Sequence, residues 1–233
     1  MRRFLPLALM VGMVFLSVGA NRPAAANTGA QLLTGILTKM ETAHRNLRSM
    51  RASVVQQKVN TQIGTKDTDY GMLIYKPGVK GKGKLRIDYT KPDTRVLSVV
   101  GESFTFYQPR INQVFKSTLA KASKGRTGFT PLLGLDRSLK ALTNDFNIDY
   151  VREEMVNGKT ATQLRLTPKR GGDLASIDLW VNQETWLPTQ YKINDRNGDY
   201  TIVKLTNTEI NVALKDADFN VSYPSGAKVV DKI

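Results

Sequence analysis

Apolar and polar residues alternate one by one in many short segments of this chain, and this pattern constrains the fold more than any other feature. The segments follow residue 51 and are separated by turn residues such as Asn157-Gly158. Successive side chains of a β-strand point to opposite faces, so each alternating segment predicts a strand with one apolar face. Turns at intervals of about 8–12 residues are typical of antiparallel sandwiches and barrels, so we expect one antiparallel, strongly curved sheet of about ten or eleven strands.

Two segments carry many apolar residues without this alternation. Residues 28–50 place them at spacings of three and four, which predicts an amphipathic helix with Thr28 as its N-cap. Residues 116–144 contain Phe129 and several leucines among glycines and a proline, which predicts short helical turns or a loop with an apolar face. We expect both apolar faces to pack against the inside of the curved sheet.

The N-terminus has the parts of a secretory signal peptide. Two arginines precede an apolar run over residues 4–18, and three consecutive alanines end at Ala26. We predict a signal peptide over residues 1–26, with Ala20 as the alternative cleavage point, and a single exported domain over residues 27–233. The chain contains no cysteine, so this domain has no disulfide and depends on burial for its stability.

Positive charge dominates the chain, whose formal net charge is +14. The densest basic cluster comprises Lys76, Lys80, Lys82, Lys84 and Arg86. Alternation directs Arg86 away from the apolar face that contains Ile87, whereas a binder of single-stranded nucleic acid places stacking aromatic residues on its basic face. We interpret the cluster as solvated exterior, with contact to an anionic partner as the alternative. For an exported protein, we expect that partner to be anionic lipid or an acidic protein surface and not nucleic acid.

The chain offers little for catalysis or metal binding. His44 is its single histidine, there is no cysteine to pair with it, and the G-x-S-x-G nucleophile motif is missing. Asp195, Asn197 and Asp199 follow a D-x-N-x-D rhythm, but the glycine stands at the fourth position and no distal glutamate completes a calcium loop. We interpret these three residues as a hairpin turn. We expect a non-enzymatic protein with no catalytic residues, no metal and no cofactor.

Four stretches of the chain share their order and spacing with one known family. In chain order they read LIYKPGVKGKGKLRIDYTKP, VVGESFTFYQP, LRLTPKRGGDLASIDLWVN and DADFNVSYPSGAKVVD. Together with the signal peptide, they resemble the outer-membrane lipoprotein carrier family of the LolA type. The resemblance covers essentially the whole exported chain, and it depends on the order of the motifs because no single motif is specific.

The resemblance implies an α+β fold that is mainly antiparallel β, namely an unclosed, strongly curved β-barrel of about eleven strands with helices on the concave side as a lid. It also implies a monomeric protein in the periplasm of a diderm bacterium. Such a carrier shields the acyl chains of lipoproteins. It receives these lipoproteins from an inner-membrane ABC-type complex and delivers them to an outer-membrane acceptor.

The strand pattern and the resemblance together indicate which residues touch the cargo. The residues expected to line the hydrophobic cavity are Leu85, Ile87, Tyr89, Phe104 and Phe106. The residues expected on the lid are Leu33, Ile36, Leu37, Met40, Phe129, Leu132 and Leu133. The family has an arginine before the first strand proline that holds the lid closed, and this chain has Lys76 before Pro77. Lysine lacks the planar guanidinium fork, so we expect Lys76 to lock the lid at the cavity rim more weakly.

Two other functions remain open from the sequence. One is a lipid-sensing module of an envelope stress regulator, which shares this architecture and would be favoured by a fused second domain or a transmembrane helix. The other is a carrier of a free phospholipid, glycolipid or hopanoid, which the sequence does not separate from a lipoprotein carrier.

Overall fold

The computed structural model describes residues 25–78, 82–118, 120–121 and 139–231. The helices named here are α1 (Ala25–Asn46), α3 (Leu139–Asp145), and the short 3-10 helices η2 (Pro109–Ile111) and η3 (Asp216–Phe219). The strands are β1 (Met50–Asn60), β2 (Thr65–Lys76), β3 (Lys84–Lys91), β4 (Arg95–Val100), β5 (Ser103–Gln108), β6 (Gln113–Thr118), β7 (Phe146–Val156), β8 (Lys159–Pro168), β9 (Leu174–Asn182), β10 (Pro188–Asp195), β11 (Tyr200–Ile210) and β12 (Lys228–Val230).

All of these strands form one 12-stranded sheet in the order β12-β6-β5-β4-β3-β2-β1-β11-β10-β9-β8-β7. Neighbouring strands run antiparallel, except that β12 pairs with β6 in parallel. The two edge strands, β7 and β12, do not pair with each other, so the sheet is unclosed. The prediction of a curved, unclosed, mainly antiparallel fold is confirmed, and the described residues form twelve strands in place of about eleven.

The turn between β7 and β8 consists of two residues that readily adopt positive φ angles. Asn157 and Gly158 join β7 to β8 with φ angles of 52° and 75°. Two consecutive residues with positive φ match the right-handed twist of the flanking strands, and asparagine followed by glycine adopts this conformation most easily. The hairpin predicted at this dipeptide is therefore present.

The first helix ends earlier than its apolar spacing predicts. It spans Ala25–Asn46, whereas the expected helix covered residues 28–50. Leu47 follows the helix, and Met50 is already the first residue of β1. Both are buried in the same core as the helix residue Ile36. Apolar residues at helical spacing therefore continue past the end of the helix because the connecting chain faces the same core.

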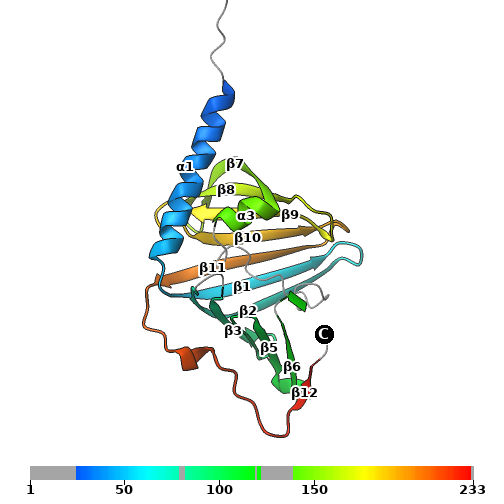
Figure 1. Cartoon of the computed structure of the whole chain (residues 1–233). Helices are drawn as coiled ribbons and strands as arrows, with labels where there is room; N and C mark the ends of the chain where they lie inside the picture. The colour runs from blue at the N-terminus through cyan, green and yellow to red at the C-terminus, as the bar shows by residue number, and fades with distance from the viewer. Residues whose placement is uncertain (1–24, 79–81, 119, 122–138, 232–233) are drawn as a thin grey trace, which may run out of the picture.

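Strands from opposite ends of the sheet share one core. The buried cluster joins residues of β3 and β4 with residues of β8 and β9, so the sheet curves around this face, which is its concave face. Helix α1 contacts α3 and β7, and its N-terminal part rises beyond the strands (Figure 1). Residues 211–227, which connect β11 to β12, wrap past β3, β5 and β6 (Figure 1). Within the described residues, no helix has the length and apolar character that crossing a membrane requires.

Candidate functional site

The concave face is apolar along β2 to β5. Residues that pair directly across an antiparallel ladder point to the same face, so the strand register identifies rows of side chains. We call two of these the apolar rows, and they consist of Tyr75, Leu85, Val99 and Phe104, and of Leu73, Ile87, Leu97 and Phe106. All are buried except Phe106, which packs against the buried cluster. The expected cavity residues therefore share the concave face, with Tyr89 beyond the end of the apolar rows, and their contact with a cargo remains a prediction.

Helix α1 packs against the concave face with its predicted stripe. Ile36 is buried, and Leu33, Leu37 and Met40 pack against the core without being fully buried. Leu32, nearer the start of the helix, leaves 45% of its surface exposed. The remaining expected lid residues, Phe129, Leu132 and Leu133, lie outside the described residues. Of the four described lid residues, only Ile36 is therefore fully buried against the core.

A cation–aromatic contact also attaches α1 to the sheet. Nζ of Lys39 lies 4.3 Å from the ring centroid of Trp186, which stands between β9 and β10. Such contacts contribute about 0.5–1 kcal/mol at exposed sites. Closer to the N-terminus, a Cβ atom added at Gly29 or Gly35 would meet nothing within 4 Å. These two positions of the helix therefore face solvent and make no contact with the sheet.

At the other end of the same strands, the concave face becomes polar. We call Gln56, Lys58, Asp69, Tyr89 and Arg95 the polar cluster. Gln56 pairs with Asp69 in the ladder, and Tyr89 pairs with Arg95, so these side chains share the concave face. Nη2 of Arg95 donates to Oδ1 of Asp69, and the guanidinium carbon lies 5.0 Å from the Tyr89 ring centroid. The phenol of Tyr89 donates to Oε1 of Gln56 at 2.7 Å.

Burial shifts the pKa values of two members of the polar cluster. It raises the pKa of the Tyr89 phenol well above its ordinary value, and the nearby carboxylate of Asp69 adds to this effect. Burial lowers the pKa of Lys58, a shift that Asp69 opposes and Arg95 reinforces. The sequence reading missed this cluster. Its signal was present in β1, where the inward positions change from Val54 to the polar residues Gln56 and Lys58.

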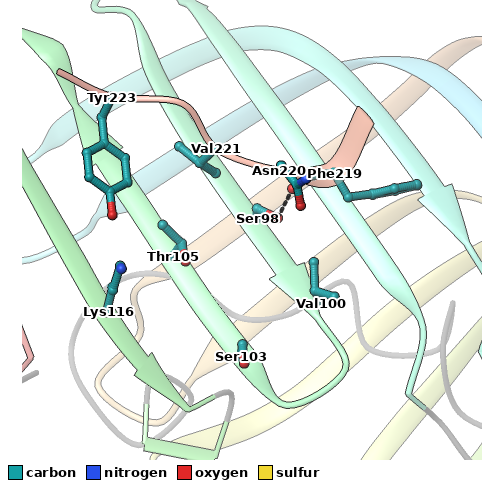
Figure 2. A pocket seen from close by; sticks show the side chains of 9 residues that line it. All are labelled: Ser98, Val100, Ser103, Thr105, Lys116, Phe219, Asn220, Val221 and Tyr223. Carbon is teal, nitrogen blue, oxygen red and sulfur yellow. Dashed lines mark hydrogen bonds between the residues drawn. The ribbon is translucent and has the colours of Figure 1, made fainter. Parts of the chain in front are cut away.

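The convex face of β3 to β6 is covered by residues 216–223, which we call the C-terminal segment. Phe219 in this segment is fully buried. Oγ of Ser98 donates to the carbonyl of Phe219 at 2.6 Å, and Nη1 of Arg86 donates to the carbonyl of Asn220 at 2.7 Å. Between the segment and the strands lies a shallow pocket of about 320 Å³, into which Thr105, Lys116 and Tyr223 project (Figure 2). The C-terminal segment is thus part of the folded domain.

The structure places Lys76, Lys84 and Arg86 of the basic cluster on this convex face, whereas Lys80 lies outside the described residues. Nζ of Lys76 lies 3.1 Å from Oδ1 of Asp216, and Nζ of Lys84 lies 2.8 Å from Oδ2 of the same carboxylate. The hydrogen bonds from these two lysines lower the pKa of Asp216, and the bond from Lys84 has the larger effect. Lys76 follows the inward-facing Tyr75 in β2, so its described contact is on the face opposite the apolar rows. A lid-locking role for Lys76 therefore stays a prediction that this contact does not support.

The other polar residues noted in the sequence have structural positions. His44 lies half-buried on α1. Asp195 and Asp199 flank the turn between β10 and β11, where the amide of Asp195 donates to the carbonyl of Asp199 at 2.9 Å. The predicted hairpin turn is therefore present. No group of three potential metal ligands comes together within the portion of the chain that the structure describes.

An unclosed, curved sheet with an apolar concave face and a covering helix defines a class of periplasmic proteins that bind lipids or lipoproteins. The family model for the outer membrane lipoprotein carrier protein LolA matches residues 45–222. The chain belongs to this family, which confirms the resemblance seen in the sequence. A comparison with curated proteins finds no match.

Several solved structures share the fold at low sequence identity. An uncharacterized conserved protein from Thermus thermophilus is 14% identical with a TM-score of 0.56, and the match covers 87% of this chain and 100% of that one. MucB is 15% identical with a TM-score of 0.54, covering 87% of this chain and 66% of that one. A chain of the Pseudomonas aeruginosa MucA/MucB complex is 16% identical with a TM-score of 0.50, covering 81% of this chain. This chain spans only 60% of that last relative.

Proposed function

We propose that this protein is a periplasmic carrier that shields the acyl chains of lipoproteins and moves them from the inner to the outer membrane. An inner-membrane ABC-type complex would load it, and an outer-membrane acceptor would unload it. The proposal combines the family membership with the concave apolar face. It includes no catalytic step, because transfer requires only that the cargo be bound and released.

The physical reason for a carrier is the cost of exposing acyl chains to water. Each exposed CH₂ group costs about 0.8 kcal/mol, so a lipoprotein with two or three acyl chains does not cross the aqueous periplasm unaided. A site whose binding free energy equalled this full cost of exposure would bind its cargo too tightly to release it. If α1 leaves the concave face during loading, the contacts of Ile36 are lost, and this loss subtracts from the affinity.

One observation carries the proposal more than any other. The core on the concave face also receives helix α1, which contacts α3 and β7 and whose inward residues Leu33, Leu37 and Met40 are only partly buried. An element that completes a permanent core buries such residues more fully, since interiors pack densely. A partly buried cover is consistent with an element that exchanges places with an apolar ligand.

Photo-crosslinking tests the proposal directly. A photo-reactive residue replaces Ile87 on the concave face, and the matched variant carries it at Ile74, which points to the convex face of the neighbouring strand β2. Each protein is mixed with a purified acylated lipoprotein and inner-membrane vesicles that contain its releasing complex. We expect crosslinks to the acyl chains from position 87 and not from position 74. Equal labelling from both positions, or none from 87 and from a second variant at Phe104, would overturn the proposal.

A second candidate is a module that senses a lipid or lipoprotein and passes the signal to a partner protein. The likeness to MucB, which has been solved together with MucA, favours this candidate. The two functions differ in the fate of the cargo. When outer-membrane vesicles that contain an acceptor are added to the loaded protein, a carrier releases its crosslinkable cargo to them, whereas a sensing module retains it.

A further inference from the structure

Several hydrogen-bonding atoms on the concave face are buried and have no partner among the residues that the structure describes. They are Nε of Arg95, the hydroxyl of Tyr191 and Oγ of Ser117. Ladder pairing places Arg95 opposite Tyr89, and Ser117 opposite Phe104, so both share the face of the apolar rows. The large majority of buried polar atoms in native proteins have a partner. Unpaired donors on the face that is expected to bind cargo indicate that the cargo supplies acceptor atoms.

Arg95 is the most informative of these residues. Its guanidinium uses Nη2 for Asp69 and lies against the Tyr89 ring, which leaves the buried Nε–H without a partner in the described chain. The Arg95 side chain is still 20% exposed. This exposure belongs to other atoms of the side chain, because Nε itself is buried, so a ligand at Nε has to displace the groups that cover it. An arginine can bind an oxyanion through a second N–H while it keeps its carboxylate.

An ion pair on the opposite face shows what a purely structural arrangement looks like in this protein. Nε of Arg165 donates to Oδ1 of Asp178 at 2.8 Å, and Nδ2 of Asn194 donates to Oδ2 of Asp178 at 3.1 Å. Both carboxylate oxygens of the buried Asp178 thus have partners, and the Nε–H of Arg165 is used. In the pair formed by Arg95 and Asp69, by contrast, the Nε–H of the arginine has no partner among the described residues.

A second cation stands near Arg95 on the same face. Lys58 lies on β1 two residues after Gln56 and interacts electrostatically with both Asp69 and Arg95. Two cations against one buried carboxylate leave excess positive charge inside the polar cluster, although the exposed Asp67 also acts on Lys58. The bound acceptor is therefore expected to be anionic.

The polar and apolar parts of the face are separated along the strands. On β4, Arg95 belongs to the polar cluster, and Val99, four residues later, belongs to an apolar row. Four residues of a strand span about 13 Å, so the face has distinct polar and apolar ends. An amphiphile matches this arrangement when its acyl chains lie on the apolar rows and its head group lies at Arg95.

We propose that Arg95 and Lys58 bind the phosphate oxyanion of an amphiphilic cargo whose acyl chains occupy the apolar rows. This proposal rests on one part of the proposed function, the binding of acyl chains by the apolar rows, and it goes beyond that function in the head group, because the diacylglycerol anchor of a lipoprotein carries no phosphate. It adds a chemical preference that distinguishes an anionic phospholipid head group from a neutral diacylglycerol moiety. Free phosphate would satisfy the same donors without using the apolar rows.

Binding of three probes to the full-length exported protein tests the proposal. Phosphatidylglycerol supplies both chains and phosphate, diacylglycerol with the same chains supplies no phosphate, and inorganic phosphate supplies no chains. We expect phosphatidylglycerol to bind about tenfold more tightly than diacylglycerol, since a charge-assisted hydrogen bond is worth roughly this factor. Inorganic phosphate at millimolar concentration is expected not to displace the phospholipid. Displacement by phosphate alone would overturn the proposed role of the acyl chains in placing the head group.

Substitutions identify the residues responsible. Arg95→Met is expected to remove the preference for phosphatidylglycerol and to leave diacylglycerol binding unchanged, whereas Lys58→Met reduces the preference partly. Arg165→Met removes an arginine from an ion pair on the opposite face and is the matched control, expected to keep the full preference. Because Arg95→Met leaves Asp69 buried without its partner, the double variant Arg95→Met/Asp69→Leu removes both charges together and keeps the test valid if the single variant misfolds.

The outcomes separate the two proposals. If the parent protein binds both lipids equally, the phosphate site is wrong while the acyl-binding role of the apolar rows stands. If the preference survives in the Arg95 variants, the assignment of Arg95 is wrong. If the parent binds neither lipid in an assay that detects acyl binding by a control carrier, both this inference and the acyl-binding role of the apolar rows are overturned.

Discussion

The phenol of Tyr89 on β3 reaches across β2 and donates a 2.7 Å hydrogen bond to Oε1 of Gln56 on β1. The β2 residue that pairs with Tyr89 is Gly71. A glycine at this position removes the side chain that would otherwise stand beside Tyr89 on the concave face. The contact joins three strands and holds the polar cluster at a defined place on the sheet.

This arrangement predicts a strong effect of Gly71→Ala. A Cβ atom at Gly71 would lie 2.3 Å from the carbonyl oxygen of Asp88, so the β2–β3 ladder must shift. We expect a loss of at least about 1–3 kcal/mol in the free energy of unfolding, measured by urea denaturation. The control is Gly35→Ala in α1, where the added Cβ meets nothing within 4 Å and helix propensity predicts a gain of about 1 kcal/mol. Equal stabilities of Gly71→Ala and the parent would contradict the prediction.

The C-terminal segment is expected to contribute strongly to stability through Phe219. This side chain is fully buried against the convex face of the sheet. Phe219→Ala should lower the free energy of unfolding by about 3–5 kcal/mol, because it removes apolar burial and leaves a cavity. Ile63→Ala, which alters a side chain that is 72% exposed, should change stability by less than about 0.5 kcal/mol. A similar small change for both variants would show that the segment detaches in solution.

The contacts of Asp216 predict a dependence of stability on pH and salt. Hydrogen bonds from Lys84 and Lys76 lower the pKa of this carboxyl, so its contribution to stability is present above the unfolded value and is lost as the pH falls through the folded pKa. Asp216→Asn should therefore lower the melting temperature slightly at pH 7 and at low salt. The difference from the parent should disappear in strong acid and shrink at high salt, since the pair is exposed. A difference that grows in acid would contradict this assignment.

Trp186 is expected to report displacement of α1 by cargo. In the structure, Lys39 of α1 lies over the Trp186 ring. Trp180 is the only other tryptophan in the chain. In a Trp180→Phe background, cargo binding should change the fluorescence emission of Trp186. Lys39→Ala should produce part of this change before cargo is added, because it removes a contact of about 0.5–1 kcal/mol. Unchanged Trp186 emission at saturating cargo would show that α1 stays in place.

The strands were predictable from the sequence because their periodicity reflects burial. Leu85, Ile87 and Tyr89 alternate with charged and polar residues, and the structure buries all three on one face. The end of the first helix was less predictable. Leu47 and Met50 continue the helical spacing although they lie beyond the helix, since a connection that faces the core also carries apolar residues.

The position of the basic cluster illustrates the limit of pattern analysis. Alternation correctly separated Arg86 from the apolar face, but it gave no indication that the convex side is covered. Arg86 lies against the carbonyl groups of Asp218 and Asn220, more than a hundred residues later in the chain. The interpretation of this cluster as solvated exterior therefore holds only in part.

The amino-acid sequence by itself determined the local pattern of this protein: which side of each strand is apolar, where the chain turns and which family it resembles. These properties depend on neighbouring residues, whose side chains alternate at a fixed period. The tertiary structure alone decided which distant groups meet, such as Asp69 with Arg95 and Asp216 with Lys84. Such meetings depend on strand order and sheet curvature, which arise when many weak contacts along the whole chain are satisfied together.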